Sequence, residues 1–366
     1  MALTAGIVGL PNVGKSTLFN AITKAGVEAA NYPFATIEPN VGMVEVPDHR
    51  LNDITKLVRP KKTVPTTFEF TDIAGIVKGA SKGEGLGNKF LSHIRQVDAI
   101  CQVVRCFDDG NITHVSGKVD PISDIETINL ELIFADLDTV EKRMARVAKI
   151  AKTKDKDAVA EMEVLEKLKE ALENNQLANT VEFYDEQLPY VRNLFLLTRK
   201  KMLYVANIGE DEVADPTGNP YLAQVEALAK TQGAEVVPVC ARLEEEIAEL
   251  DDEEKQIFLE DYGMTESGLD RLIKKAYSLL GLATYFTAGE QEVRAWTFKV
   301  GMKAPQAAGI IHSDFERGFI RAETLSYDDL MSYQSVAKAR EAGKYRSEGK
   351  EYVVQDGDIM LFRFNV

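Results

Sequence analysis

Short apolar, strand-like runs alternate with longer polar or amphipathic segments over the first part of the chain. Four such runs occupy residues 5–8, 42–46, 68–71 and 99–105. The segments between them are long enough to hold helices, an alternation typical of a parallel sheet with helical crossovers. Two further runs, 201–206 and 234–240, resume the pattern after a long interruption. We therefore expect an α/β domain with a doubly wound, mostly parallel sheet.

The interruption has a different periodicity. From about Thr127 to Asn175 the chain contains no proline or glycine, and apolar residues recur at spacings of four and three. They form two stripes, one through Ile133, Leu137, Val140, Met144 and Val147 and one through Val159, Met162, Leu165, Leu168 and Leu172. Two long helices joined by the polar break 152–156 would form an antiparallel α-helical coiled-coil arm, inserted into the α/β domain. A helical pair packed flat on that domain is the alternative.

The composition changes again beyond Gly281. Strand-like runs occupy 293–300, 319–325, 352–354 and 359–364, and an Asp356-Gly357 turn signal separates the last two. We expect a small, mostly β domain here. The predicted division is 1–127 and 199–280 for the two parts of the α/β domain, 128–198 for the arm, and 281–366 for the C-terminal domain.

A phosphate-loop motif, GxxxxGKS, lies between the first apolar run and a helix-like segment. Residues 9–17 read GLPNVGKST. A loop at a helix N-terminus directs backbone N–H groups and the helix dipole at one point, which favours a bound triphosphate. Lys15 is expected to contact the β- and γ-phosphates, and the Ser16 hydroxyl to bind Mg²⁺. The residues expected to contact the nucleotide here are Asn12, Val13, Gly14, Lys15, Ser16 and Thr17.

The run 68–71 ends in a DxxG motif, Asp72-Ile73-Ala74-Gly75. Its position after a strand and about 55 residues beyond Lys15 predicts that Asp72 holds the Mg²⁺ through water and that the Gly75 N–H contacts the γ-phosphate. Thr36 is the predicted switch residue that completes the metal shell, and a threonine that caps a turn is the alternative.

The residue directly after the DxxG motif is Ile76. Ras-like enzymes orient the attacking water with a glutamine at this position, and isoleucine has no group that could do so. Another residue must position the water, or hydrolysis is slow. His114 follows the run 99–105 in a loop and is a candidate, although a lone loop histidine is more often structural or solvated.

Base selection depends on the segment after the run 201–206. GTPases carry an NKxD motif here, whereas this chain reads Asn207-Ile208-Gly209-Glu210. The longer Glu210 side chain would crowd the edge of guanine, and a site built for one pattern of donors rejects a changed pattern strongly. Adenine therefore fits this segment better than guanine does, and we predict that the nucleotide is ATP. The Cys240-Ala241-Arg242 segment is expected to support the base through backbone N–H groups.

The overall charge and composition limit the class of protein. The net charge of −15 argues against non-specific nucleic-acid binding over the whole surface. The charge is nevertheless uneven, since seven cations and two acids lie between Glu141 and Lys156 at the predicted arm tip. No apolar stretch reaches the roughly 18 residues of a membrane span. Three scattered cysteines suggest a reducing compartment. We expect a cytoplasmic protein with no membrane or DNA partner.

Taken together, several segments resemble the YchF, or Obg-like ATPase, family of translation-factor-related P-loop NTPases. These segments are GLPNVGKST, ANYPFATIEPN, DIAGIVKGASKGEGLGN, HVSGKVDP, the 207–210 box, DFERGFIRAE and VQDGDIMLFRFNV. The resemblance spans essentially the whole chain and implies a P-loop NTPase G-domain that prefers ATP, a coiled-coil arm and a C-terminal TGS domain with a β-grasp fold. It also implies association with the ribosome, in particular its large subunit with ribosomal RNA and protein.

The resemblance implies site roles as well. His114 becomes the candidate catalytic group, and a hydrophobic residue in place of the glutamine fits Ile76. Asn12 matches an asparagine that helps to bind K⁺ beside the phosphates in related enzymes, and a plain turn asparagine is the alternative. Two functions stay open at this point: a slow Mg²⁺-dependent ATPase, and a ribosome- or RNA-binding module that nucleotide only stabilises. A GTP-preferring translational GTPase is a third, less favoured reading.

Overall fold

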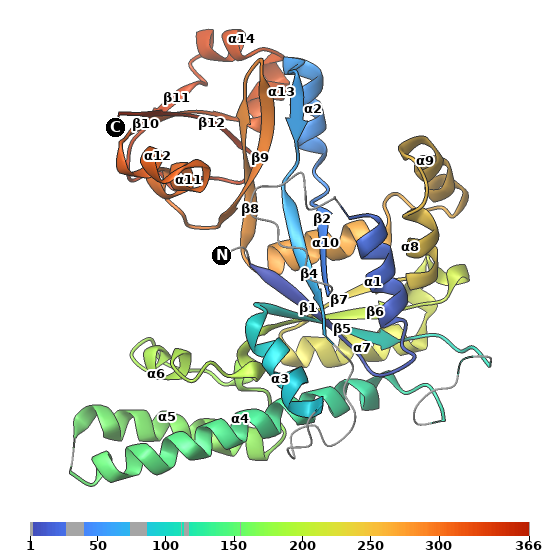
Figure 1. Ribbon diagram of the computed structural model, residues 1–366, viewed down its shortest axis with the longest axis vertical. Coiled ribbons are helices and arrows are strands. Elements are labelled where there is room, and N and C mark those ends of the chain that lie inside the picture. The colour runs from blue at the N-terminus through green and yellow to red at the C-terminus, as the bar shows by residue number, and fades with distance from the viewer. Residues whose placement is uncertain are drawn as a thin grey trace. The chain divides into compact units, whose positions relative to one another are not determined.

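The computed structural model describes residues 3–26, 40–73, 86–110, 112, 117–153 and 155–365 (Figure 1). The chain divides into two compact units, one comprising 1–44 and 69–272 and the other 45–68 and 273–366. The segment 45–68, which the sequence analysis assigned to the first part of the α/β domain, thus belongs with the C-terminal residues. It contributes strand β3 (Lys62–Val64), which pairs in parallel with β9 (Glu292–Lys299).

A six-stranded sheet forms the centre of the first unit, in the order β2-β4-β1-β5-β6-β7. The strands are β2 (Val41–Glu45), β4 (Thr67–Asp72), β1 (Thr4–Val8), β5 (Ala99–Arg105), β6 (Lys201–Asn207) and β7 (Glu235–Val239). β1 pairs in parallel with both β4 and β5, and β5, β6 and β7 continue in parallel. This confirms the predicted doubly wound sheet. Because strand order reverses beside β1, the loops at the carboxyl ends of these strands outline a ligand crevice.

Helices flank this sheet: α1 (Lys15–Lys24), α3 (Leu86–Gln96), α7 (Pro220–Gln232), α8 (Ala241–Ile247) and α9 (Asp252–Asp261). Helix α10 (Gly268–Leu279) contains the boundary between the two units, after Leu272. Residues next to each other in the sequence determine where such helices begin and end. In α7, Asn219 caps the first turn through Leu222 N–H, and Gly233 ends the helix with a φ of 62°.

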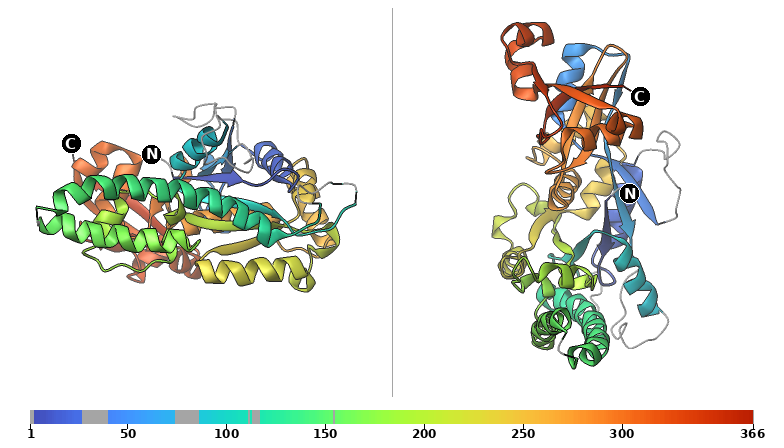
Figure 2. Two further views of the ribbon diagram at one scale, coloured as in Figure 1. Left: turned by 90° about the horizontal axis from the view of Figure 1, so that it is seen from below. Right: turned by 90° about the vertical axis from the view of Figure 1, so that its left-hand side faces the viewer.

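The predicted antiparallel helical pair is present. Helix α4 (Pro121–Ala151) begins earlier than residue 128, after its cap Asp120, and α5 (Lys156–Glu173) follows the cap Asp155. The two helices lie side by side (Figures 1 and 2). The inner half of α4 packs in the core of the sheet through Ile125, Ile128 and Leu132. Its outer half packs on α5 in a separate core that includes Val140, Val147, Val164, Leu165 and Leu168. Beyond this pair, α6 (Leu188–Arg192) contributes Val191 to the same core.

The second unit has a six-stranded mixed sheet in the order β11-β10-β12-β8-β9-β3. Its remaining strands are β8 (Leu282–Ala288), β10 (Phe319–Ser326), β11 (Arg346–Glu348) and β12 (Asp358–Phe364). The central strands β8 and β12 are parallel, and β9 and β10 flank them in antiparallel pairs. This is the strand arrangement of a β-grasp fold.

Helices cover both faces of this mixed sheet. On one face, α11 (Ala304–Ile311) packs on Tyr285, Phe298 and Phe362, and α12 (Ser313–Arg317) follows it. On the other, α2 (His49–Val58), α13 (Tyr327–Tyr333) and α14 (Val336–Glu341) share a core with Phe286.

One strand prediction is wrong. Residues 352–354 form only an isolated bridge, between Val353 and Lys303, so no hairpin precedes β12. The Asp356-Gly357 pair does turn, with Gly357 at a φ of 86°, but the Asp356 carboxylate is used by Arg50 and by the Thr284 N–H. Side-chain contacts to distant segments, rather than strand pairing, therefore determine this turn.

Candidate nucleotide-binding site

The phosphate loop connects β1 to α1 in a conformation that only glycine fits well at residue 14. Gly14 precedes α1 with a φ of 95°, and a Cβ placed there would lie 2.1 Å from Asn207 Nδ2. Asn12 also has a positive φ, of 62°. Gly9 is confined as well, since its Cβ would lie 2.9 Å from Val13 Cγ2. Backbone conformation and close packing therefore explain the glycines of the motif.

Asn207 holds the phosphate loop to the opposite side of the pocket. Its Nδ2 donates to the Val13 carbonyl oxygen over 2.9 Å, and its Oδ1 accepts from the Ala241 N–H over 3.0 Å. The Asn207 side chain is 5% exposed. Since both ends of the amide are used inside the protein, Asn207 braces the site and orders the loop before α8.

Lys15 and Asp72 meet at the phosphate end of the site. The Lys15 ammonium donates to the Asp72 carboxylate, and both side chains are largely buried. Asp72 ends β4 next to β1, while Lys15 is the first residue of α1, so the sheet order brings the two motifs together. Ser16 follows Lys15 in the exposed first turn of α1. The predicted pairing of the two motifs in space is present.

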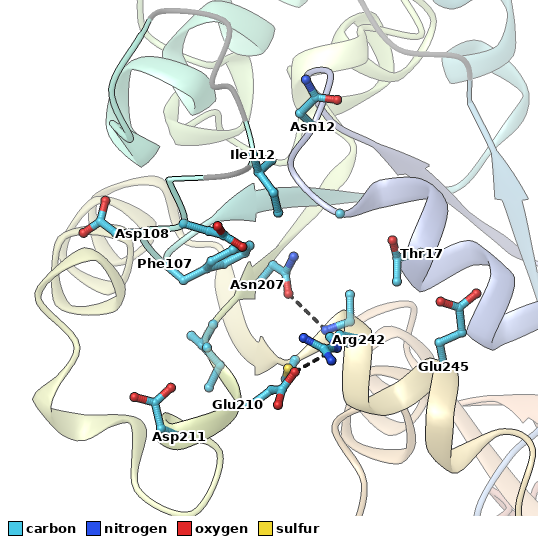
Figure 3. A pocket seen from close by; sticks show the side chains of 16 residues that line it. Asn12, Thr17, Phe107, Asp108, Ile112, Asn207, Glu210, Asp211, Arg242 and Glu245 are labelled. Carbon is cyan, nitrogen blue, oxygen red and sulfur yellow. Dashed lines mark hydrogen bonds and ion pairs between the residues drawn. The ribbon is translucent and has the colours of Figure 1, made fainter.

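A cavity of about 700 Å³ lies beside the phosphate loop (Figure 3). It is lined by most of the residues that were predicted to contact the nucleotide, both from the phosphate loop and from the segments expected at the base: Asn12, Gly14, Thr17, Asn207, Ile208, Glu210, Cys240 and Ala241. Val13 does not line it; its side chain is buried and its carbonyl is held by Asn207. The predicted residues Thr36, Gly75 and His114, together with Ile76, lie outside the described residues.

An ion pair crosses the part of the pocket predicted to hold the base. Arg242 Nε lies 3.0 Å from Glu210 Oε1 and 3.6 Å from Glu246 Oε1. Figure 3 shows Glu210 and Arg242 facing each other, joined by a dashed line. The Glu210 carboxylate, which takes the place of the GTPase aspartate, therefore already has a cationic partner from α8.

Sequence reasoning missed a further wall of the pocket, formed by Phe107, Asp108, Asp109 and Ile112. It is held by Arg105, which is 1% exposed and donates to three backbone carbonyls: Phe107 at 3.1 Å, Asp109 at 3.1 Å and Ile112 at 3.0 Å. The guanidinium also lies 4.8 Å from the centre of the Phe107 ring. A charged residue at the end of the mostly apolar run 99–105 was the available signal.

The cysteines near the pocket are kept protonated. Burial raises the pKa of the Cys106 thiol to about 12, and burial also raises the pKa of Cys240. A thiol with a raised pKa is a poor nucleophile, so both act as small apolar side chains. Within the described ranges, no cluster of three or more His, Cys, Asp or Glu residues is placed to hold a metal ion. None of the described helices is both long and apolar enough to span a membrane.

Comparison with known proteins identifies the family. A family model described as "50S ribosome-binding GTPase" matches residues 4–135, and the YchF-GTPase C-terminal model, described as "Protein of unknown function (DUF933)", matches residues 282–365. The Bacillus subtilis protein named ribosome-binding ATPase YchF is 74% identical over 100% of both chains. The protein of the same name from Escherichia coli O157:H7 is 58% identical, again over 100% of both chains.

The chain belongs to the YchF family. A solved structure of the Schizosaccharomyces pombe YchF GTPase is similar throughout, with a TM-score of 0.88 and 42% identity, covering 99% of this chain and 97% of that one. The family resemblance drawn from the sequence motifs is thus confirmed over both units. The YchF relatives carry the words ATPase and GTPase in different names, which makes base selection the question that the pocket must answer.

Proposed function

We propose that this protein is a ribosome-binding ATPase that hydrolyses ATP slowly and whose nucleotide state controls its interaction with the ribosome or translation factors. The observation that carries the proposal is the braced phosphate loop, in which Asn207 fixes Val13 while Lys15 faces Asp72. A preorganised loop of N–H groups beside a cationic side chain stabilises the charge of a triphosphate and of its transition state. Lys15 is the group that contributes the positive charge.

Mg²⁺ is the metal that the donors beside this loop fit. A serine hydroxyl and a carboxylate are hard oxygen donors, the type that Mg²⁺ prefers, and Ser16 and Asp72 supply them. The Lys15 ammonium donates to the Asp72 carboxylate, so a positive charge is favoured at this carboxylate. Thr36 completes the set in this proposal. The metal would neutralise charge on the phosphates.

Water positioning is assigned to His114, since Ile76 offers no polar group. K⁺ beside Asn12 would add a second positive charge near the phosphates, the role that an arginine finger has in other NTPases. Both assignments follow from the family resemblance and are to be tested separately from nucleotide binding.

ATP is the proposed substrate because of the Glu210–Arg242 ion pair. A GTPase uses its carboxylate to accept two guanine hydrogens. Here the corresponding carboxylate belongs to the longer glutamate and is drawn towards Arg242 at 3.0 Å. Guanine would have to compete with a guanidinium for this acceptor, whereas adenine, which has no N1–H and no 2-amino group, does not need it.

The ribosome is proposed as the macromolecular partner, and its large subunit as the contact site. The relatives that match over their full length are named ribosome-binding ATPases. A cytoplasmic location is part of the same proposal.

Turnover with and without ribosomes tests the function. We expect ATP hydrolysis that depends on Mg²⁺, loss of at least about 100-fold in kcat for Lys15→Ala, and weaker binding of GTP than of ATP by calorimetry. If ribosomes leave turnover unchanged and Lys15→Ala keeps its cellular function, the protein is a nucleotide-stabilised binding module instead. Tighter binding of GTP would contradict the assignment of the base.

A further inference from the structure

Two groups of cations on the helical arm differ in their partners, apart from Lys167, which donates to the Glu182 backbone carbonyl oxygen. The shaft cations are Lys142, Arg143 and Lys169, and each has a carboxylate partner. Lys142 Nζ lies 2.7 Å from Asp138, Arg143 Nε lies 2.6 Å from Glu161, and Lys169 Nζ lies 3.0 Å from Glu141. The charge of the shaft is therefore balanced within the arm itself.

The tip cations are Arg146, Lys149, Lys152 and Lys156, at the end where α4 passes into α5. All four are exposed. In the part of the chain that the structure describes, none of the four has a carboxylate within ion-pair distance, and the nearby Asp155 instead caps α5 through the Ala158 N–H. This end of the arm presents uncompensated positive charge on a protein whose net charge is −15.

Helix stability explains only part of this cluster. Cations near the C-terminus of α4 interact favourably with the helix dipole, which accounts for Lys149 and Lys152. Lys156 is the first residue of α5, where the positive end of the helix dipole repels a cation. Asp155 and Asp157 beside it offset this repulsion, but the dipole of α5 gives no reason for a cation here, whereas an external anionic partner does.

We propose that the tip cations form a docking surface for the phosphate backbone of structured RNA. The inference rests on the proposed function, in which the ribosome is the partner, and adds the surface and the chemistry of contact. Uncompensated cations gain affinity for a polyanion because binding releases its condensed counterions. The remaining surface is net acidic and repels phosphate. Electrostatic forces therefore orient the protein so that the tip of its arm faces the RNA.

A protein partner is the alternative that the experiment must separate. An open groove of about 530 Å³ borders the tip and is lined by Met144, Ala148 and Met162 among others. A peptide in this groove would be held by apolar contacts, which depend little on salt. Phosphate contacts, in contrast, lower log K linearly with log salt. The salt dependence of binding therefore distinguishes the two partners.

The test compares two triple variants of the full-length protein with equal changes in net charge. The tip variant carries Lys149→Gln, Lys152→Gln and Lys156→Gln, and the shaft control carries Lys142→Gln, Arg143→Gln and Lys169→Gln. Binding is measured by co-sedimentation with ribosomes and by fluorescence titration with a protein-free ribosomal RNA hairpin, each from 50 to 200 mM KCl. Circular dichroism and ribosome-free ATPase activity check that each variant is folded.

We expect the tip variant to reduce the slope of log K against log salt by about two to three, because each phosphate contact contributes ~0.7 to 0.9. Over this salt range, three contacts correspond to a change of roughly 20- to 40-fold in affinity that the tip variant no longer shows. The shaft control is expected to keep the wild-type slope. Basal ATPase activity should be unchanged in both.

Three results would overturn the proposal or separate it from the proposed function. Equal slopes for wild type and tip variant would remove the tip from the RNA contact. Weaker ribosome binding by the tip variant, with an unchanged slope and unchanged binding to the hairpin, would assign the tip to a protein partner. Wild type that binds the hairpin through the tip but fails to bind ribosomes would support this surface and overturn the ribosome as the partner.

Discussion

The side-chain amide of Asn207 donates a hydrogen bond to the carbonyl oxygen of Val13 over 2.9 Å. This bond joins the loop after β6 to the phosphate loop, two segments about 190 residues apart in the sequence. The same side chain accepts from Ala241, so one buried amide sets the positions of three pocket loops. Asn207 lies in the segment that was predicted from the sequence to select the base. Here its hydrogen-bonding groups serve the architecture of the pocket.

Asn207→Ala is expected to weaken both folding and nucleotide binding. The substitution leaves the Val13 carbonyl and the Ala241 N–H without partners in a buried site, at about 1 to 3 kcal/mol each. We expect the free energy of unfolding to fall by about 2 to 4 kcal/mol and nucleotide affinity to fall by about tenfold, measured by urea unfolding and by calorimetry. The exposed Asn193 provides the control, Asn193→Ala. Unchanged affinity in Asn207→Ala would show that the loops hold their positions without the brace.

Gly14→Ala should abolish tight nucleotide binding. The new Cβ would meet Asn207 Nδ2 at 2.1 Å, and the φ of 95° is strained for alanine. Either the brace breaks or the loop moves, so we expect affinity for ATP to fall by more than about tenfold, equivalent to at least ~1.4 kcal/mol. Gly218→Ala is the matched control, because a Cβ at residue 218 meets nothing within 4 Å. Wild-type affinity in Gly14→Ala would mean that the described loop conformation is not the one that binds nucleotide.

Arg105→Met should loosen the wall of the pocket formed by Phe107, Asp108, Asp109 and Ile112. The variant keeps an unbranched side chain but removes the donors to the carbonyls of Phe107, Asp109 and Ile112. We expect faster hydrogen exchange at the amides of this wall and a several-fold loss of ATP affinity, with little change elsewhere in the sheet. Arg105→Lys should recover only part of the loss, since an ammonium lacks the planar fork of donors. Exchange rates equal to wild type would exclude a bracing role for Arg105.

Asp136 should give folding stability a specific pH dependence. Its buried carboxylate accepts from the Leu197 and Thr198 N–H groups and from the Thr198 hydroxyl, yet burial raises its pKa above the ordinary value. With the folded pKa raised, the folded state binds more protons than the unfolded state between the two pKa values. The stabilisation is therefore complete below the unfolded pKa, about 4, and is lost as pH rises through the folded pKa.

The comparison of wild type with Asp136→Asn isolates this effect. The stability of wild type relative to the variant should decline as pH rises from about 4 through the raised folded pKa, measured by urea unfolding at a series of pH values. A relative stability that increases with pH over the same range would show that the three hydrogen bonds lower the pKa more than burial raises it.

Local pattern was sufficient for the parts of the fold whose pairing is sequential or fully buried. The runs 5–8, 99–105 and 201–206 lie within β1, β5 and β6, since short, mostly apolar runs between turns are typical of the buried strands of a parallel sheet. The helical arm was predicted from a different local pattern, because its apolar stripes follow the period of a helix. The closeness of the phosphate loop and the DxxG motif followed from two motifs at the ends of strands that a doubly wound sheet places side by side, whereas the direct contact of Lys15 with Asp72 was not predicted.

Long-range and backbone-directed contacts were not visible in the sequence. The short strand β3 pairs with β9 across about 230 residues, and its three residues carry no pattern of their own. Arg105 was missed because its partners are carbonyls, which every residue has and which only the loop conformation brings together. The run 352–354 has strand-like side chains but lies where only one bridge can form.

Helix α2 is synthesised long before the C-terminal residues on which it packs. Leu51 and Ile54 are buried with Phe286 and Leu325, which are translated more than two hundred residues later. At about 5 to 20 residues per second, the apolar face of this helix is synthesised roughly 10 to 50 s before its partners. The apolar face of α2 therefore stays without its native partners during most of translation. It is buried only when the C-terminal residues that pack on it have been synthesised.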